Sequence, residues 1–409
     1  MKILWQAYDR ADYTGGPIIN TIRLLPEFKK IGHEIITIIG HNGTGYPNAE
    51  KLRENNINCL TYRIPKYSED HTKIFLEALI QNKPDIFVSN ISVQAGFAGR
   101  WAQHWGIPVI HTHRSNDALN CGTAEFFFAG PPEWRLNALV CVNNYLLDQI
   151  KALNSKGYIS RMIPSGVPIP ILTNDKIKYN ELKIVYSGRI IQEQKRINDL
   201  LSSFISIARI MNNVSLTLIG TGEAYYVKRL KAKVIEAGMS NRIRFVGRLL
   251  EDDYKNELMK HHIIVLLSDY EGIPGAVMDG MSCGLVPIVL NVNGIDELVK
   301  HRENGLIIQN REKAFQEAIR ELLENIDLYK RLSNNARNTI RNNFSLEKTV
   351  LQWHELFKEV ISTSDIKKPM IMPDRINLPK ENHLLIQHRS KLSFRKLMYK
   401  YKRLFNALR

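Results

Sequence analysis

A short stretch that follows a predicted buried strand combines a carboxylate, a proline and several glycines. The apolar run 263–267 precedes it, and Glu271 and the turn Gly272-Ile273-Pro274-Gly275 follow. Pro274 suits a first helical position, because it has no backbone N–H to leave unpaired there. The positive end of the helix dipole would face the turn, and the glycines would let a ligand approach the backbone closely. The segment therefore predicts a site for a phosphate-bearing ligand.

A second carboxylate, Asp279, lies about one turn into the predicted helix. It shares a helix face with Gly275, because residues four apart lie on the same side. Its neighbours are apolar or small, so an ionised carboxylate there needs a ligand hydroxyl, an amide or a cation as its partner. On this interpretation, Asp279 faces the space that Glu271 also borders. The alternative is an acid in the first helical turn that interacts only with the helix dipole.

Three further turns could place binding groups at the same site. Gly15-Gly16 follows the first predicted strand and opens a helix. Arg189 follows a strand of the second half and Lys195 precedes the next helix, so a guanidinium fork and an ammonium could bind a diphosphate. Gly220-Thr-Gly222 lacks the third glycine of a dinucleotide fingerprint and is interpreted as a structural turn that borders the nucleotide. Taken singly, these features also suit ordinary turn glycines and solvated surface cations.

Short β-branched runs alternate with helical stretches, which is typical of parallel sheets wrapped by helices. The predicted strands are residues 2–4, 34–39, 86–89, 109–111 and 138–142 in the first half, and 183–186, 215–219, 243–246, 263–267 and 286–290 in the second. Two doubly wound α/β domains follow from this pattern. Ligands of such sheets bind outside the carboxyl ends of the strands, so we expect the site in a cleft between two facing domains.

The predicted break between the domains is a proline-rich segment. Residues 163–170 contain three prolines and a glycine, and the polar stretch 173–180 follows. This composition sustains neither helix nor sheet. We therefore divide the chain into domains 1–168 and 169–345, a helix at 346–364 and a tail at 365–409.

Composition places the body of the protein among globular proteins. Of 409 residues, 44% are hydrophobic and 24% are charged, which is ordinary for a soluble fold. We find no signal peptide and no membrane-spanning apolar run in the sequence. The four cysteines lie far apart, without metal-ligand spacing. We therefore expect a reduced cytoplasmic location and no metal site.

The tail is strongly basic. Residues 366–409 hold 12 Lys or Arg and two acids, a net charge of +10 out of +15 for the chain. A helix over 394–408 would place its apolar residues on one face and its cations on the other. Such a helix suits an anionic membrane interface, and we expect residues 391–409 to bind one. The same helix could instead dock on the protein, and binding of nucleic acid is disfavoured because the body lacks a basic stripe with interleaved aromatic residues.

Most of residues 1–360 resembles the glycosyltransferases of GT-B fold, specifically the retaining family 4. The resemblance lies in an ordered series of motifs: Gly15-Gly16, Gly32-His33-Glu34, the segment 108–113, the segment 163–167, Gly188-Arg189 with Gln194-Lys195-Arg196, the segment 219–222, the segment 245–247, and the segment 271–287. It implies two Rossmann-like domains facing a cleft, with residues 1–168 on the acceptor side and 169–345 binding the nucleotide-sugar. The helix 346–364 would cross back to the first domain, and 365–409 would form the basic amphipathic tail.

The resemblance also implies roles for single residues. Arg189 and Lys195 would bind the diphosphate of a nucleotide-sugar, and Gly16 would lie beside the same phosphates from the other domain. Glu271 would contact the sugar hydroxyls. Asp279 stands where the family has a glutamate that contacts the ribose, so the carboxylate here is one methylene shorter.

Two further parts of the site come from the same resemblance. The backbone of Ile273, Pro274 and Gly275 would meet sugar or phosphate oxygens. His113 matches a family position near the reacting sugar carbon and the acceptor. In such retaining enzymes the leaving phosphate can take the acceptor proton, so no general base is needed. Acidic clusters with metal-ligand spacing are absent from the sequence near these positions, so we expect no cofactor and no essential metal.

The implied function is a hexosyltransferase that moves a sugar from a UDP- or GDP-linked donor to a glycan or lipid-linked acceptor. The implied setting is surface polysaccharide or lipopolysaccharide biosynthesis, with the enzyme cytoplasmic and peripheral on the inner face of the membrane. The alternatives are a GT-B epimerase or phosphorylase, or a catalytically silent protein that binds nucleotide-sugars.

Overall fold

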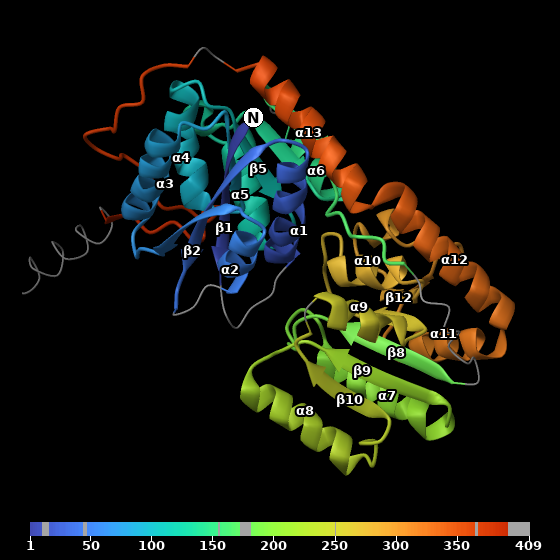
Figure 1. Cartoon of the computed structure of the whole chain (residues 1–409). Coiled ribbons are helices and arrows are strands. Elements are labelled where there is room, and N and C mark those ends of the chain that lie inside the picture. The colour runs from blue at the N-terminus through green and yellow to red at the C-terminus, as the bar shows by residue number, and fades with distance from the viewer. Residues whose placement is uncertain are drawn as a thin grey trace, which may run out of the picture. The chain divides into compact units, whose positions relative to one another are not determined.

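The structure, a computed structural model, describes residues 1–9, 16–43, 47–153, 156–171, 181–249, 251–364 and 367–391. The chain forms two compact units (Figure 1). The N-terminal unit comprises Met1–Ile163 and Val350–Arg409, and the C-terminal unit comprises Pro164–Thr349. Each unit is built on its own parallel β-sheet, and each is described separately below.

The N-terminal unit contains a seven-stranded sheet with strand order β3-β2-β1-β4-β5-β6-β7. Its strands, all paired in parallel, are β1 (Lys2–Asp9), β2 (Glu34–His41), β3 (Asn58–Arg63), β4 (Ile86–Asn90), β5 (Val109–His113), β6 (Ala138–Cys141) and β7 (Ile159–Met162). Its helices are α1 (Gly16–Lys30), α2 (Pro47–Glu54), α3 (Ser68–Asn82), α4 (Val93–His104), α5 (Ala118–Ala129) and α6 (Asn144–Lys151), with the 3₁₀ turn η1 (Pro132–Trp134). The central strands β1, β4 and β5 are buried along almost their whole length, because helices cover both faces of the sheet.

The C-terminal unit contains a six-stranded parallel sheet with strand order β10-β9-β8-β11-β12-β13. The strands are β8 (Leu182–Ser187), β9 (Val214–Ile219), β10 (Ile243–Gly247), β11 (Ile263–Leu266), β12 (Val286–Leu290) and β13 (Leu306–Ile308). The helices are α7 (Ile197–Ile210), α8 (Ala224–Glu236), α9 (Glu251–Met259), α10 (Gly275–Ser282), α11 (Lys313–Glu324) and α12 (Ile326–Asn343), with the 3₁₀ turn η2 (Ile295–Glu297). A large apolar core extends over this sheet and its helices.

The last helix, α13 (Leu346–Ser362), begins in the C-terminal unit and continues into the N-terminal unit. Within the N-terminal unit, the rings of Trp5 and Trp353 lie 5.2 Å apart, and those of Phe28 and Phe357 lie 5.3 Å apart. All four rings are almost fully buried. The far end of the chain thus supplies part of the core of the N-terminal unit.

The predicted α/β class with two doubly wound sheets is confirmed, and the ten predicted strands correspond to ten observed strands. Three more strands, β3, β7 and β13, were not predicted. All three lie at sheet edges, and β3 and β7 are only partly buried. An edge strand has one solvated side, so it lacks the long apolar run that marks a central strand.

The predicted division after residue 168 lies a little beyond the boundary of the units, which falls after Ile163. Val167 explains the difference, because its N–H donates to the carbonyl of Phe344 (3.0 Å) and its carbonyl accepts from the N–H of Leu346 (3.0 Å). These bonds attach the segment around Val167 to the C-terminal unit. The predicted polar break at 173–180, the predicted tail helix at 394–408 and Gly15 lie outside the described residues.

Candidate functional site

Two strand-to-helix turns interlock at the edge of the C-terminal sheet where its strands end, which we call the carboxyl edge. The N–H of Gly188, after β8, donates to the carbonyl of Ile219 (3.0 Å), and the N–H of Ile190 donates to that of Thr221 (2.8 Å). Gly220 has φ +143°, and a Cβ there would lie 1.8 Å from the carbonyl oxygen of Gly188. Only glycine fits such a close approach, so the Gly220-Thr-Gly222 turn has the structural role that was predicted.

The side chains of Lys195 and Glu271 meet at this edge. Lys195 lies between β8 and α7, and Glu271 lies between β11 and α10. The ammonium and the carboxylate form a hydrogen-bonded ion pair. Only 13% of the lysine side chain and 10% of the glutamate side chain is exposed, so water screens the pair weakly. The structure therefore brings together two of the residues that the sequence singled out.

Gln194 connects Arg189 to the segment that carries Glu271. Arg189 Nη2 donates to Gln194 Oε1 (2.5 Å), and Gln194 Nε2 donates to the carbonyl of Tyr270 (2.9 Å). The backbone carbonyl of Gln194 also accepts from the N–H of Asp269 (3.0 Å). This buried amide was not assigned a role from the sequence, although its place between Arg189 and Lys195 was a signal.

Asp269 fixes the same turn from its other side. Its carboxylate accepts from Arg196 Nε (2.5 Å) and forms a second ion pair with Arg311. Arg311 also donates from Nε to the carbonyl of Leu267 (2.9 Å). Asp269 and Arg311 are far apart in the sequence, and no motif joins them, so sequence reasoning could not have found this pair.

Tyr186 lies beneath the turn. It is fully buried, and its hydroxyl donates to the carbonyl of Arg189 (2.7 Å). Burial and, secondarily, the negative charge of Glu271 raise the pKa of Tyr186 well above its ordinary value of 10.0. The hydroxyl therefore stays protonated and acts as a fixed donor that holds the backbone of Arg189.

Helix α10 begins one residue later than predicted. Pro274 is the N-cap, in an extended conformation, rather than the first helical residue, and no side chain caps this end. The N–H groups of Val277 and Met278 bond to the carbonyl of Pro274, whereas the first N–H groups of any helix lack an intrahelical partner. A Cβ on Gly275 would meet nothing within 4 Å, so a ligand has room to approach this end.

The other side of α10 is pressed onto the sheet. A Cβ on Gly280 would lie 2.8 Å from the side chain of Ile264 in β11. Asp279 is half-buried and lies one turn after Gly275, on the same face of the helix. Ile273 is partly exposed beside them. Asp279 thus shares a helix face with Gly275, where a Cβ would meet nothing within 4 Å, and stands next to the position that packs on β11.

In the N-terminal unit, His113 is the last residue of β5 and only 1% exposed. Neither ring nitrogen has a hydrogen-bond partner among the described residues. Burial lowers the pKa of His113 to about 4, because desolvation disfavours the charged form. The imidazole is therefore neutral at pH 7 and retains one free donor and one free acceptor.

Gly16 and Arg114 lie at the carboxyl edge of the N-terminal sheet. Gly16 is the exposed first residue of α1, and a Cβ there would meet nothing within 4 Å. With the Asn20 amide assigned so that its oxygen faces the guanidinium, Arg114 Nη2 donates to that oxygen (2.8 Å). Burial lowers the pKa of Arg114 to about 10, so it remains charged at pH 7. Arg114 was not predicted, although it directly follows His113.

The described residues include no group of three or more His, Cys, Asp or Glu side chains that could hold a metal ion. Across the same part of the chain, no helix has the length and apolar character needed to span a bilayer.

Comparison with known sequences shows a similarity to one family, whose model matches part of the chain. Residues 172–339 match the model of the glycosyl transferases group 1. An uncharacterized glycosyltransferase of Methanocaldococcus jannaschii is 26% identical over 357 residues, which is 85% of this chain and 95% of that protein. The UDP-Gal:alpha-D-GlcNAc-diphosphoundecaprenol alpha-1,3-galactosyltransferase of Escherichia coli is 30% identical over 127 residues, which is 31% of this chain and 32% of that protein.

Comparison with solved structures gives the fold. Anabaena HepE, solved in complexes with UDP and with UDP-glucose, superposes with a TM-score of 0.72 at 16% identity, covering 88% of this chain and all of HepE. A glycosyltransferase from Rickettsia africae superposes with a TM-score of 0.73 at 19% identity, covering 89% of this chain and 99% of that protein. The family model matches residues 172–339, and the two Rossmann-like sheets have the GT-B fold of the solved glycosyltransferases, so the chain is similar to the group 1 glycosyltransferases.

Proposed function

We propose that the chain is a retaining hexosyltransferase that moves a sugar from a UDP-linked donor, or a GDP-linked one, to a glycan or lipid-linked acceptor. The observation that carries this proposal is the buried pair of Lys195 and Glu271, with Arg189 tied to the same turn through Gln194. Two cations, Arg189 and Lys195, would bind a diphosphate, and one carboxylate, Glu271, would accept from sugar hydroxyls. All three residues lie at the carboxyl edge of the C-terminal sheet.

Donor binding would change the partners of this pair. The diphosphate would take Lys195 and Arg189, since phosphate oxygens accept charge-assisted hydrogen bonds from both. Glu271 would then be free to accept from two sugar hydroxyls. The open N-terminus of α10 would add backbone N–H donors and its dipole, with Ile273, Pro274 and Gly275 lining the approach. Asp279 would accept from the ribose hydroxyls.

The reaction breaks the bond between the sugar C1 and the phosphate oxygen. The acceptor oxygen attacks C1 on the face that the phosphate leaves, and the acceptor proton passes to the leaving phosphate. Arg189 and Lys195 would stabilise the charge that develops on the diphosphate, with each well-placed donor contributing about 3 to 4 kcal/mol by analogy with oxyanion holes. These two cations are why we propose a reaction that needs no metal and no cofactor.

The N-terminal unit would supply the acceptor side. His113 is neutral, and neither of its ring nitrogens has a partner within the part of the chain that the structure describes, so it would form hydrogen bonds with the transferred sugar or the acceptor. Gly16 would leave space for the phosphates beside α1. We propose that the neighbouring cation, Arg114, also faces this region.

The names of similar proteins support uridine donors and a lipid-linked acceptor. HepE was solved with UDP-glucose, and the relative from Escherichia coli is named for UDP-Gal and a diphosphoundecaprenol acceptor. A relative from Staphylococcus aureus is named for capsular polysaccharide biosynthesis. We therefore propose a role in surface polysaccharide assembly, with the enzyme cytoplasmic and peripheral on the inner membrane face.

Ligand-induced stabilisation is the first test, because a ligand that binds only the folded state raises its stability by mass action. We expect UDP and UDP-hexoses to raise the melting temperature, and ADP and CMP to leave it unchanged. No shift with any nucleotide, GDP included, would refute the proposed donor site. Saturable binding of a nucleotide-sugar with neither hydrolysis nor sugar transfer would instead show a catalytically silent binding protein. A product whose anomeric NMR signal shows the inverted configuration at C1 would refute the retaining mechanism.

A further inference from the structure

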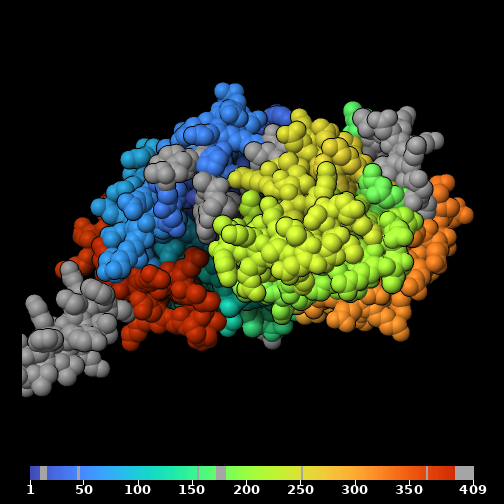
Figure 2. Space-filling model, turned by 90° about the horizontal axis from the view of Figure 1, so that it is seen from below, coloured from blue at the N-terminus to red at the C-terminus, as the bar shows by residue number. Residues whose placement is uncertain are grey.

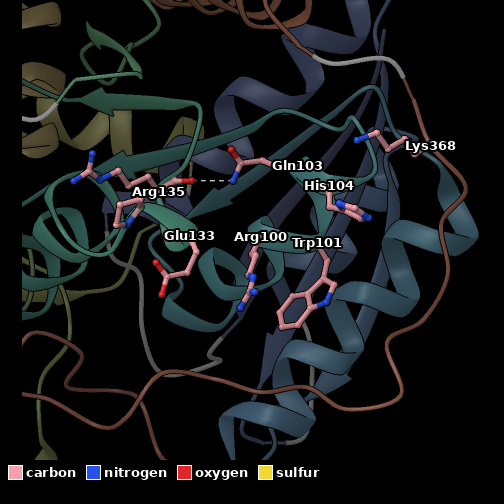
Figure 3. A pocket seen from close by; sticks show the side chains of 8 residues that line it. Arg100, Trp101, Gln103, His104, Glu133, Arg135 and Lys368 are labelled. Atoms are coloured by element: carbon pink, nitrogen blue, oxygen red, sulfur yellow. Dashed lines mark hydrogen bonds between the residues drawn. The ribbon is translucent and has the colours of Figure 1, made fainter.

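An irregular segment follows α13 and crosses the N-terminal unit; we call residues 367–391 the strap. It starts at the edge of the sheet where the strands begin, the amino edge. There Lys367 Nζ forms an ion pair with Asp85 Oδ1 (2.6 Å), and the N–H of Lys368 donates to the carbonyl of Trp105 (3.0 Å). Lys368 also lines a cavity of about 500 Å³ together with the last turn of α4 and η1 (Figure 3).

The other end of the strap lies at the carboxyl edge of the same sheet. The N–H of Ser68, the first residue of α3, donates to the carbonyl of Arg389 (2.9 Å), and the N–H of Arg389 donates to Ser68 Oγ (3.0 Å). From the first turn of α4, Gln94 Nε2 donates to the carbonyl of Gln387 (2.9 Å). Helices α3 and α4 both follow strands directly, so their first turns mark the carboxyl edge.

A third helix is held in the same way. A Cβ on Gly122 in α5 would lie 2.3 Å from the carbonyl oxygen of Leu384, so the strap backbone rests directly on the helix. His388 is buried, with Ser68 Oγ 2.9 Å from Nδ1 and the carbonyl of Pro379 2.8 Å from Nε2. The first halves of three successive helices thus contact one short piece of the strap.

The last described residues are held by two acids of α3. Glu69 accepts from Ser390 Oγ (2.7 Å) and from the N–H of Lys391 (3.0 Å). Asp70 forms an ion pair with the side chain of Lys391. The chain therefore leaves the described structure from a fixed place, next to the start of α3. Figure 2 shows the strap in red on the surface of the unit.

The described chain ends among charges of both signs, because Glu69 and Asp70 contact its last residues, whereas the sequence beyond it is strongly basic. Arg63, Lys66, Arg389 and Lys391 are exposed around this end, and the apolar side chain of Ile386 is 56% exposed. Residues 392–409 contain six Lys or Arg and no Asp or Glu. Cations near an anionic bilayer are attracted to its surface. A tether without fixed contacts would leave the orientation of the unit undefined.

We infer that the strap positions the start of the basic tail at the carboxyl edge of the N-terminal unit. An anionic bilayer would therefore bind the protein at this edge, where β5 ends at His113. This inference rests on the proposed function, because an acceptor attached to a lipid must reach that edge from a membrane. Its new content is the strap as an orienting element and the side of the unit that faces the lipid.

Hydrogen exchange of the full chain bound to vesicles tests the orientation. With phosphatidylcholine vesicles that contain phosphatidylglycerol, we expect amides in residues 63–70, 114–121 and 387–391 to exchange about tenfold more slowly than in the free protein. Amides at the amino edge, in residues 83–85 and 104–107, should be unchanged. Protection at the amino edge, no protection at all, or equal protection by pure phosphatidylcholine would overturn the inference.

Two matched variants test the role of the strap. Glu69→Gln and Glu77→Gln each remove one negative charge from α3, but only Glu69 contacts the strap, since Glu77 pairs with Lys73 on the helix surface. We expect Glu69→Gln to keep vesicle binding and lose at least half of the protection at 63–70 and 114–121. Glu77→Gln should match the original chain, and equal behaviour of the two variants would refute the anchoring role.

The same preparations separate this inference from the proposed function. UDP-induced stabilisation is measured without vesicles. A protein that binds UDP and lacks carboxyl-edge protection refutes only the orientation. A protein that shows the protection and binds no nucleotide refutes only the donor site.

Discussion

Lys195 and Glu271 satisfy each other's charge inside the C-terminal unit, each with about nine-tenths of its side chain buried. Two buried opposite charges are costly to remove from water, and loss of one partner leaves the other uncompensated. The pair is therefore already neutral in the ligand-free site. A donor must then compete with Glu271 for Lys195, which makes this pair the natural place to test both stability and activity.

Replacing the lysine should reveal both roles. We expect Lys195→Ala to lower the free energy of unfolding by about 3 kcal/mol, because the buried carboxylate of Glu271 loses its cationic partner. We also expect it to lower kcat at least about tenfold. Denaturant unfolding and donor turnover measure the two effects. Lys183→Ala is the control, because Lys183 pairs with Glu181 at the surface and surface pairs contribute less than about 1 kcal/mol. Equal losses in both variants would contradict the buried-pair argument.

Gln194 should matter although it carries no charge. We expect Gln194→Ala to lower kcat about tenfold, because Arg189 loses its acceptor and the Glu271 segment loses a donor to Tyr270. Gln194→Glu keeps the acceptor for Arg189 and should retain more activity than the alanine variant. Donor turnover compares the two, and identical rates would show that Arg189 is positioned by other contacts.

Asp279 should affect nucleotide affinity more than chemistry. We expect Asp279→Ala to weaken UDP binding about tenfold, the effect of losing about 1.4 kcal/mol of binding free energy. Asp279→Glu introduces the longer glutamate side chain that the GT-B family 4 enzymes have at this position. This variant should bind UDP at least as well as the original chain. Calorimetry gives both dissociation constants. Unchanged binding by the alanine variant would leave Asp279 with only a helix-dipole role.

Acidification should destabilise the protein partly through His113. Its pKa in the folded state is about 4, below the ordinary value of 6.5, so the unfolded chain takes up a proton first as the pH falls. Stability from the neutral ring is present above pH 6.5 and is lost between pH 6.5 and 4, by about 3 kcal/mol for this single group. Denaturant unfolding of His113→Gln should show a shallower decline over that range. The exposed His104 provides the control, and a His104→Gln variant with the same shallow decline would exclude a specific role for His113.

Chelation tests the proposed absence of a metal from the reaction. If Arg189 and Lys195 supply the positive charge for the leaving diphosphate, excess EDTA should leave donor turnover within about twofold of the untreated rate. Restoration of lost activity by Mg²⁺ or Mn²⁺ would contradict that proposal.

Much of the fold could be predicted because local patterns mark its central elements. The strands β1, β4 and β5 are buried on both faces, and their apolar runs stand out in the sequence. The edge strands β3 and β7 carry polar residues on a solvated side, so their sequences do not differ from those of loops. The division after Ile163 also depends on bonds from Val167 to residues near the end of the unit, which no local pattern reveals.

The site was predictable only where a residue type indicates its own chemistry. Glu271, Arg189 and Lys195 stand in turns after strands, and turns at the carboxyl edge converge in space. Gln194 stands in a motif, but an uncharged amide does not indicate a role by its residue type, and Arg311 has an ordinary sequence context. The roles of both come from partners that the folded chain brings together. Pro274 was placed one residue too far into its helix, because its fixed φ suits both an N-cap and a first helical position.

The N-terminal unit has a consequence for synthesis of the chain. Its core includes Trp353 and Phe357, and the first halves of α3, α4 and α5 contact residues beyond 383. Chains are made from the N-terminus and domains tend to fold as they emerge, yet this unit lacks those parts until the other unit has been translated. The N-terminal unit is therefore synthesised first but can complete its fold only after the end of the chain has been made. A truncation near the C-terminus should destabilise the N-terminal unit.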